Sequence, residues 1–303
     1  MRTAPGVDRA VAVLTVLGAA PDRGLTLAEI VRRTSMSKAT CHAVLASLVE
    51  ARWLLRHPDG PTYRLGPGLI ALGEAAQRGF PALPYAQDVM LGLGEELRLE
   101  CMATAVVDGE IAILAKAGVP APLTMSATPG VRVPLLPPLA SVFLAWWPTD
   151  RVVRLMRRVA GPTVALDAYL EGLNVVRRRG FAAGQETPSR RQLGQALATG
   201  ARSGRTAVAD AARLLHDLEA EDYQIRQLDP RAQYQLNHIA APVFDTSGDV
   251  SLALTLIGFV GTTSGRDVER IGARLCAAAA KVTAAIHGRQ PVDQPVAAAA
   301  SGR

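Results

Sequence analysis

The sequence is poor in the features that mark secreted, membrane-spanning and metal-dependent proteins. Its three cysteines, Cys41, Cys101 and Cys276, are too few and too scattered for a disulfide framework or a cysteine-rich metal site. No apolar run reaches the roughly 18 residues that a bilayer span requires, and residues 1–8 are short and polar rather than signal-like. We therefore expect a cytoplasmic protein without membrane contact.

Patterns of common enzymes are missing as well. The sequence has no GxSxG nucleophile elbow, no phosphate loop ending in GK[ST] and no HExxH helix. The five histidines are dispersed, and His216 and Asp217 fall on an expected surface helix, where solvation is favoured over catalysis. We predict no enzyme, no metal and no cofactor; the alternative is a hydrolase hidden in an α/β domain that begins near residue 80.

Positive charge and apolar residues are what the sequence does contain. The 33 Lys and Arg residues exceed the 27 Asp and Glu residues, so the formal net charge is +6 and the pI is near 9.6. This balance favours a polyanionic partner. At 303 residues and 49% hydrophobic, the chain can form one small and one ordinary domain, each with a core.

Residues 26–51 have the pattern of two short helices joined by a tight turn. Thr26 and Glu29 fit a capping box at the start of the first helix, and Ser37 is placed to cap the second. The second helix has apolar residues at i, i+3, i+4 and i+7, which predicts one buried stripe: Cys41, Val44, Leu45 and Leu48. The pair is either a DNA-binding helix-turn-helix or a helical hairpin packed into another kind of domain.

The flanking residues favour the DNA-binding alternative. An apolar helical stripe over 10–17 supplies a third helix, and two strand-like runs, 53–57 and 62–65, surround a turn at 58–61. Three helices and a hairpin predict a winged helix-turn-helix. Arg56 and Arg64 would then lie on the wing, near phosphates.

Longer motifs resemble one family. The runs LTLAEIVRRTSMSKAT and TYRLGPGLIALG, within residues 6–76, resemble the N-terminal domain of the IclR family of bacterial transcription regulators. The run HIAAPVFDTSGDVSLALTLIGF, residues 238–259, is similar to the family's effector-domain signature, and PLLPPLASVFLAW, residues 134–146, lies between the two. The resemblance implies an α+β protein that binds an operator in double-stranded DNA as a homodimer or homotetramer.

The implied organisation has three parts and a tail. A winged helix-turn-helix occupies 1–66, a linker helix that helps to pair subunits occupies 67–79, and an α/β GAF-like effector-binding and oligomerisation domain occupies 80–288. The linker helix packing only on its own domain is the alternative. We expect the tail, 289–303, to be disordered.

Apolar periodicity in the second domain predicts alternating helices and strands. Helices are expected over 82–99, 139–147, 151–159, 166–179 and 267–287, with a hairpin over 101–117 and a strand-rich run over 250–261. An insertion at about 187–234, absent from typical family members, contains two expected helices around Gly200–Gly204. It is interpreted as a solvated appendage, with a subunit contact or a cover over the effector pocket as alternatives.

The start of the second helix of the pair is the expected DNA contact. Family members commonly have serine where Ala39 stands and arginine where Ala43 stands, and an arginine reading guanine contributes about 1–3 kcal/mol of discrimination. We hypothesise that Lys38 and Arg64 hold the backbone and that His42 faces bases. The candidate DNA-binding residues are Thr26, Ser37, Lys38, Ala39, Thr40, His42, Ala43, Arg56 and Arg64. A head that has lost sequence specificity is the alternative.

Effector positions follow from the resemblance, residue by residue. They are Leu136, Pro138, Leu139, Ala140, Gly184, His238, Thr255 and Ile257. Leu136 replaces a usual histidine, Gly184 a frequent aspartate and Ile257 a frequent serine, so several polar groups that could bind a small carboxylate are gone. The site is therefore predicted to take a more apolar or aromatic small-molecule effector, oriented by His238 and Thr255. The alternative is a filled site in a fold kept for dimerisation.

Overall fold

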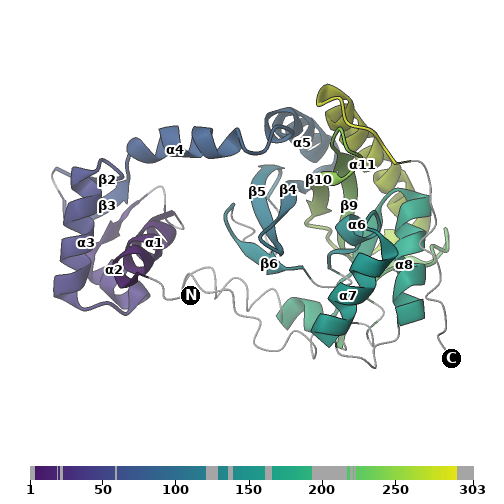
Figure 1. The fold of residues 1–303 in the computed structure, drawn as a ribbon, viewed down its shortest axis with the longest axis horizontal. Helices are drawn as coiled ribbons and strands as arrows, with labels where there is room; N and C mark the ends of the chain where they lie inside the picture. The colour runs from purple at the N-terminus through teal and green to yellow at the C-terminus, as the bar shows by residue number, and fades with distance from the viewer. Residues whose placement is uncertain are drawn as a thin grey trace. The chain divides into compact units, whose positions relative to one another are not determined.

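The chain folds into two compact units, with the boundary after Phe80 (Figure 1). A computed structural model describes residues 4–18, 20, 23–58, 60–120, 129–135, 139–160, 166–192, 217–218, 221 and 223–291. Within these ranges, no helix is long and apolar enough to cross a membrane. The expected helices around Gly200–Gly204 and residues 292–303 of the tail lie outside the described residues.

The first unit is the predicted three-helix bundle with a wing. Its elements are α1 (Pro5–Gly18), β1 (Leu25–Thr26), α2 (Leu27–Thr34), α3 (Lys38–Glu50), β2 (Leu54–Arg56), β3 (Thr62–Leu65) and α4 (Gly68–Gln77). The buried stripe of α3 packs against α1 and α2, since Cys41 and Leu45 share one core with Val13, Leu17 and Ile30. The short β1, which periodicity did not predict, pairs with β3 and completes a three-stranded sheet in the order β1-β3-β2.

Both predicted helix caps are present. The Thr26 side chain accepts from the Glu29 backbone N–H, and the Glu29 carboxylate accepts from the Thr26 backbone N–H at 2.9 Å, which completes the capping box. Ser37 caps α3 by accepting from Thr40 N–H at 3.2 Å. Between the helices, Ser35 takes a left-handed conformation with φ 55°, so the turn needs only three residues. These local bonds fix the angle at which α3 follows α2.

Two glycines attach α4 to the winged domain. The Gly66 N–H donates to Trp53 O at 2.7 Å and the Gly68 N–H donates to Arg52 O at 3.0 Å. A Cβ added at Gly66 would lie 2.5 Å from Arg52 O, so no larger residue fits this approach. Close packing against Arg52 and Trp53 therefore requires glycine at these two positions of the family-like run.

After this anchor, α4 is largely exposed. None of its residues is buried, and Ile70 and Leu72 are 64% and 48% exposed. A ten-residue helix is marginal in water unless an apolar face is covered. The helix α4 therefore offers apolar side chains that another surface could cover.

The second unit is built on a six-stranded antiparallel sheet in the order β6-β5-β4-β10-β9-β7. The strands are β4 (Glu100–Val107), β5 (Glu110–Gly118), β6 (Arg132–Pro134), β7 (Ala182–Gln185), β9 (Leu236–Phe244) and β10 (Val250–Ile257). The predicted hairpin is β4–β5, turned at Asp108 and Gly109, which both have positive φ. Two further strands, β8 (Gln233–Tyr234) and β11 (Thr263–Ser264), form a separate ribbon.

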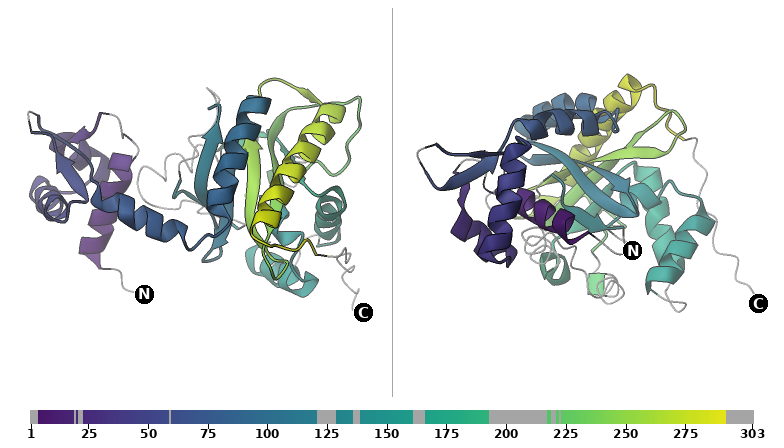
Figure 2. Two further views of the ribbon diagram at one scale, coloured as in Figure 1. Left: turned by 90° about the horizontal axis from the view of Figure 1, so that it is seen from above. Right: turned by 60° about the vertical axis from the view of Figure 1, so that its left-hand side comes forward.

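Helices cover both faces of this sheet (Figure 2). On one face lie α5 (Leu83–Leu97) and α11 (Gly265–Ala285), which contact each other and strands β4, β5 and β9. On the other face lie α6 (Ser141–Leu144), α7 (Thr149–Ala160) and α8 (Leu166–Arg179), whose apolar residues share a core with Ala182, Ala240 and Ala253 of the strands. The latter face carries the predicted effector positions that lie in the strands.

The described ends of the insertion are packed into this unit. Thr187 and Ser189 are buried at its start, and Leu218, Tyr223 and Ile225 are 1–3% exposed near its end. The Glu221 carboxylate accepts from the Ser189 backbone N–H and hydroxyl, the latter at 2.8 Å. The expectation of a solvated appendage is therefore wrong for these residues. Sequence periodicity could not reveal it, because their packing partners lie far away in the chain.

Candidate nucleic-acid interface and effector site

The N-terminal end of α3 presents the side chains that the sequence assigned to DNA. Lys38, Ala39, His42 and Ala43 are exposed, whereas Cys41 in the same turn is fully buried. No acidic residue lies in the first turn, so the positive end of the helix dipole is not offset there. The surface can approach a phosphate or a groove without steric hindrance.

Hydroxyl groups in this region are already engaged. The Ser37 and Thr40 hydroxyls are hydrogen-bonded to each other at 2.8 Å, and the Thr26 hydroxyl bonds the Glu29 carboxylate at 3.0 Å. Their first role is therefore to hold α2 and α3 in place. Of the predicted DNA-binding residues on the two helices, Lys38 and His42 are the exposed ones with long polar side chains.

The wing adds two exposed cations. Arg56 ends β2 and Arg64 lies within β3, and both side chains are exposed. Sequence reasoning left out Arg32 and Arg33, which are exposed in the last turn of α2, just before the turn into α3. Helical periodicity places Arg32 and Arg33 outside the buried stripe of α2, so the sequence could have indicated that both side chains are exposed.

The effector positions in the strands are neighbours on one face of the sheet. Ile257 lies directly opposite His238 on β9 and Glu100 on β4, and Gly184 lies opposite His238. Thr255 lies opposite Met102 and Ala240. Since directly opposed residues of antiparallel strands share a face, the structure brings Gly184, His238, Thr255 and Ile257 together.

The remaining effector positions precede α6, and the structure describes two of them. Leu139 is half-buried and Ala140 is fully buried in the core with Ala240 and Ala253, just before α6 begins. Leu136 and Pro138 lie outside the described residues. Ala140 therefore supports the sheet from the side where the predicted effector would lie.

Strand pairing reveals residues on the effector face that the sequence did not indicate. Ile257 packs in an apolar cluster with Ile113, Met102 and Val131. At the side of this cluster, Glu100 is 3% exposed and pairs with the Lys116 ammonium at 3.1 Å. An apolar surface with one neighbouring ion pair suits a flat organic molecule with a polar end.

At the other end of the same face, His238 is held by Tyr223. The Tyr223 hydroxyl and His238 Nδ1 lie 3.1 Å apart in a hydrogen bond, and the two rings stack at 5.7 Å between centroids. Gly184 provides the room, because a Cβ there would lie 2.4 Å from His238 Cε1 and 2.9 Å from Tyr223 Cζ. Glycine is thus required at this position by its neighbours, and sequence reasoning missed Tyr223.

The surroundings keep both rings neutral near pH 7. Burial, together with the nearby cations Arg190 and Arg179, lowers the pKa of His238 to about 3. Burial also raises the pKa of Tyr223 to about 12, although Arg190 acts in the opposite direction. An uncharged His238 cannot bind a carboxylate by charge and is suited to hydrogen bonding instead.

This lowered pKa predicts an acid-dependent stability. Between pH 6.5 and 3 the unfolded chain binds a proton at His238 that the folded chain excludes, so stability is lost as pH falls through this window. One such group gives a slope of at most about 1.4 kcal/mol per pH unit. We expect urea unfolding at pH 7 and pH 5 to show a smaller loss in His238→Gln than in the unsubstituted chain. His287→Gln, at an exposed position, is the control, and an equal loss in all three proteins would contradict the assignment.

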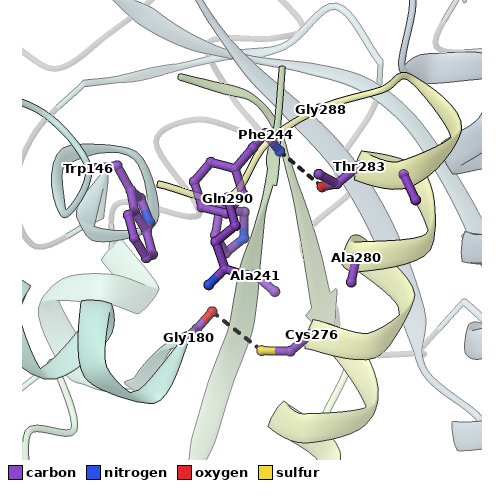
Figure 3. Close-up of a pocket in the computed structure, with 11 residues that line it drawn as sticks. Trp146, Gly180, Ala241, Phe244, Cys276, Ala280, Thr283, Gly288 and Gln290 are labelled. Atoms are coloured by element: carbon purple, nitrogen blue, oxygen red, sulfur yellow. Dashed lines mark hydrogen bonds between the residues drawn. The ribbon is translucent and has the colours of Figure 1, made fainter. Parts of the chain in front are cut away.

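A separate pocket lies between the outer edge of β9 and α11 (Figure 3). It has a volume of about 180 Å³, and Trp146 and Phe244 meet edge to face across it at 4.8 Å. Thr283 already accepts from Phe244 N–H, and Cys276 already donates to Gly180 O. None of the predicted effector positions that the structure describes is among its lining residues, and we assign it no ligand.

Metal coordination has no support in the described part of the chain. Within those ranges, no group of three or more His, Cys, Asp or Glu side chains could hold an ion.

Comparisons with known proteins point to one kind of regulator. Residues 6–58 match the family model of the IclR helix-turn-helix domain. The chain is 25% identical over 256 residues to the Pca regulon regulatory protein of Pseudomonas putida, with 82% of this chain and 72% of that protein covered.

Solved structures share the fold over nearly the full length. An IclR transcriptional regulator from Alicyclobacillus acidocaldarius is 23% identical with a TM-score of 0.58, covering 93% of this chain and 99% of that one. An IclR homologue from Microbacterium hydrocarbonoxydans, complexed with 4-hydroxybenzoate, is 22% identical with a TM-score of 0.52 and the same coverage. At these identities the likeness shows the two-domain α+β fold.

Proposed function

Because the chain belongs to the IclR family of transcription regulators, we propose that it binds an operator through α3 and the wing. It is a DNA-binding regulator and not an enzyme. The observation that carries the operator contact is the exposed start of α3, where Lys38, Ala39, His42 and Ala43 surround a capped helix N-terminus. A location in the cytoplasm, where an operator is accessible, stays a prediction.

Operator binding requires two winged domains acting together. Half-sites of a pseudo-palindromic operator lie about one duplex turn apart, so one helix cannot contact both. The exposed apolar residues of α4, Ile70 and Leu72, support pairing of two subunits along this helix. We propose a homodimer as the DNA-binding unit, with a homotetramer formed by two such pairs.

The effector proposal rests on the face that carries His238, Thr255 and Ile257. Its apolar cluster, with Met102 and Ile113, supports an aromatic ring, and the Thr255 hydroxyl and the Glu100–Lys116 pair support a polar end. A fold neighbour bound to 4-hydroxybenzoate agrees with this class of ligand. The ligand must favour one placement of the two winged domains, because only a difference in affinity shifts such an equilibrium.

The DNA contact is tested by removing the two proposed phosphate contacts, Lys38 and Arg64. In Lys38→Ala/Arg64→Ala we expect weaker binding to the chain's own upstream DNA and a shallower salt dependence. Each lost phosphate contact should reduce the slope of log K against log salt by about 0.9. The measurement is fluorescence anisotropy against upstream and scrambled duplexes across a salt series.

The control is Arg157→Ala/Arg158→Ala, which removes the same two charges from exposed side chains of α7 in the other unit. If Lys38→Ala/Arg64→Ala keeps the affinity and slope of the unsubstituted chain, the docking is wrong. Equal binding of the unsubstituted chain to both duplexes, lost as salt rises, would instead favour a DNA-binding head without sequence specificity.

A further inference from the structure

Three residues from the end of the insertion, Tyr223–Ile225, run along the free side of β7. We call them the edge segment. The Gln185 N–H donates to Tyr223 O at 2.8 Å, and the Ile225 N–H donates to Ala183 O at 3.0 Å. Gly184 and Gln224 form an antiparallel bridge between these two bonds. The edge segment thus continues the sheet beyond its last strand, with all three side chains buried.

Two glycines receive two successive side chains of the edge segment. The Tyr223 ring lies beside Gly184, and Gln224 lies beside Gly172 of α8, where a Cβ would come within 2.9 Å of Gln224 Oε1. Gln224 Nε2 also donates to Gly172 O at 3.2 Å. A close fit at two separate positions shows that the segment docks in one defined register.

The Tyr223 ring has the contacts that a bound phenol would need. His238 supplies a stacking surface and a hydrogen bond at 3.1 Å. The nearby Arg190 guanidinium lowers the pKa of the Tyr223 hydroxyl, and since a guanidinium can only donate, the hydroxyl proton is left for His238 Nδ1. The phenol is therefore recognised through its ring, its oxygen and its proton.

We propose that Tyr223 is a tethered ligand of the effector site: it occupies the place beside Gly184 and His238 that a free phenol takes when the edge segment leaves β7. This rests on the proposed function, in which the face with His238, Thr255 and Ile257 binds the effector. The ligand class is small phenols, a flat ring with a hydroxyl group. A free ligand has to compete with Tyr223. Its apparent association constant is therefore the intrinsic one multiplied by the fraction of chains whose edge segment is undocked.

Vacating the place should create a phenol site in the full-length chain. We expect p-cresol to bind Tyr223→Ala about tenfold or more tightly than it binds the unsubstituted chain, measured by calorimetry. Toluene, which has the same ring and methyl group without the hydroxyl, should bind Tyr223→Ala about tenfold more weakly than p-cresol does, because it offers no hydrogen bond to the half-buried His238 Nδ1. Tyr234→Ala is the control, since Tyr234 bonds only Asp229 N and Gln227 O in the described structure.

A second readout follows His238 directly by NMR of its ring. Tyr223→Phe keeps the ring and removes the hydroxyl, so it tests the contact even if Tyr223→Ala does not fold. In Tyr223→Phe the His238 pKa should move up toward its ordinary value, and in Tyr223→Ala added p-cresol should move it down again. An unchanged His238 titration in Tyr223→Phe would show that the hydroxyl does not hold this ring.

Two results would overturn the tethered ligand: equal p-cresol affinity in Tyr223→Ala and the unsubstituted chain, or equal binding of toluene and p-cresol to Tyr223→Ala. Operator affinity measured in the same samples separates this from the proposed function. If p-cresol binds Tyr223→Ala as expected but leaves operator affinity unchanged, the tethered ligand stands and the effector role fails. If aromatic acids change operator affinity while Tyr223→Ala gains no phenol site, the effector role stands and the tethered ligand is wrong.

Discussion

Ile70→Glu/Leu72→Glu in α4 is expected to yield a monomer that has lost most of its operator affinity. The two side chains are 64% and 48% exposed on a helix without any buried residue. Burying an aliphatic side chain contributes about 1.5–3 kcal/mol. Ile70 and Leu72 lie two residues apart, on different faces of the helix, so changing both removes the apolar side chain from whichever of the two faces pairs. A carboxylate at each place opposes burial instead, and loss of the second winged domain removes about 10²–10⁴ of avidity.

Sedimentation and fluorescence anisotropy measure the two parts of this result. Gln77→Glu is the matched control, because it adds a carboxylate to the same exposed helix without removing an apolar side chain. Its subunit association and DNA binding should stay close to those of the unsubstituted chain. A stable dimer of Ile70→Glu/Leu72→Glu at micromolar concentration would show that α4 is not the pairing surface.

Gly184→Val is expected to destabilise the second domain by about 3 kcal/mol or more, the upper range for overpacking in a core. A Cβ alone would lie 2.4 Å from His238 Cε1 and 2.9 Å from Tyr223 Cζ, and valine adds two methyl groups. The rings cannot yield easily, since they are stacked and hydrogen-bonded to each other. The thermal midpoint should fall by about 6–12 °C in a domain of this size.

Calorimetry with a double-mutant cycle identifies the cause. Gly92→Val is the control, because a Cβ at Gly92 of α5 meets nothing within 4 Å. Adding His238→Ala to Gly184→Val should restore part of the lost stability, so the two changes are strongly non-additive. If the cycle is additive, the cost of valine does not come from overlap with His238.

Local rules explain what could be predicted around the DNA contact. The capping box of Thr26 and Glu29, the Ser37 cap and the i, i+3, i+4, i+7 stripe of α3 each involve residues within two helical turns. The turn at Asp108–Gly109 is equally local, because positive φ is a property of the residues themselves. These features needed no knowledge of the rest of the chain.

The effector face was accessible only in part. The resemblance named Gly184, His238, Thr255 and Ile257, but it gave no reason for the glycine and no sign of Glu100 or Met102. Strand register decides which residues share a face, and a shift of one residue would reverse all of them. Register depends on pairing between distant strands, and one sequence alone does not contain that information.

The sequence by itself determined the caps and the buried stripe of α3, because each depends on neighbouring residues, and its family-like motifs indicated the two-domain α+β organisation. Only the tertiary structure decided that Tyr223 fills the space left by Gly184 and hydrogen-bonds His238, and that burial beside Arg190 and Arg179 keeps His238 neutral. That contact joins three strands or segments far apart in the chain, and its energy exists only after the sheet has formed.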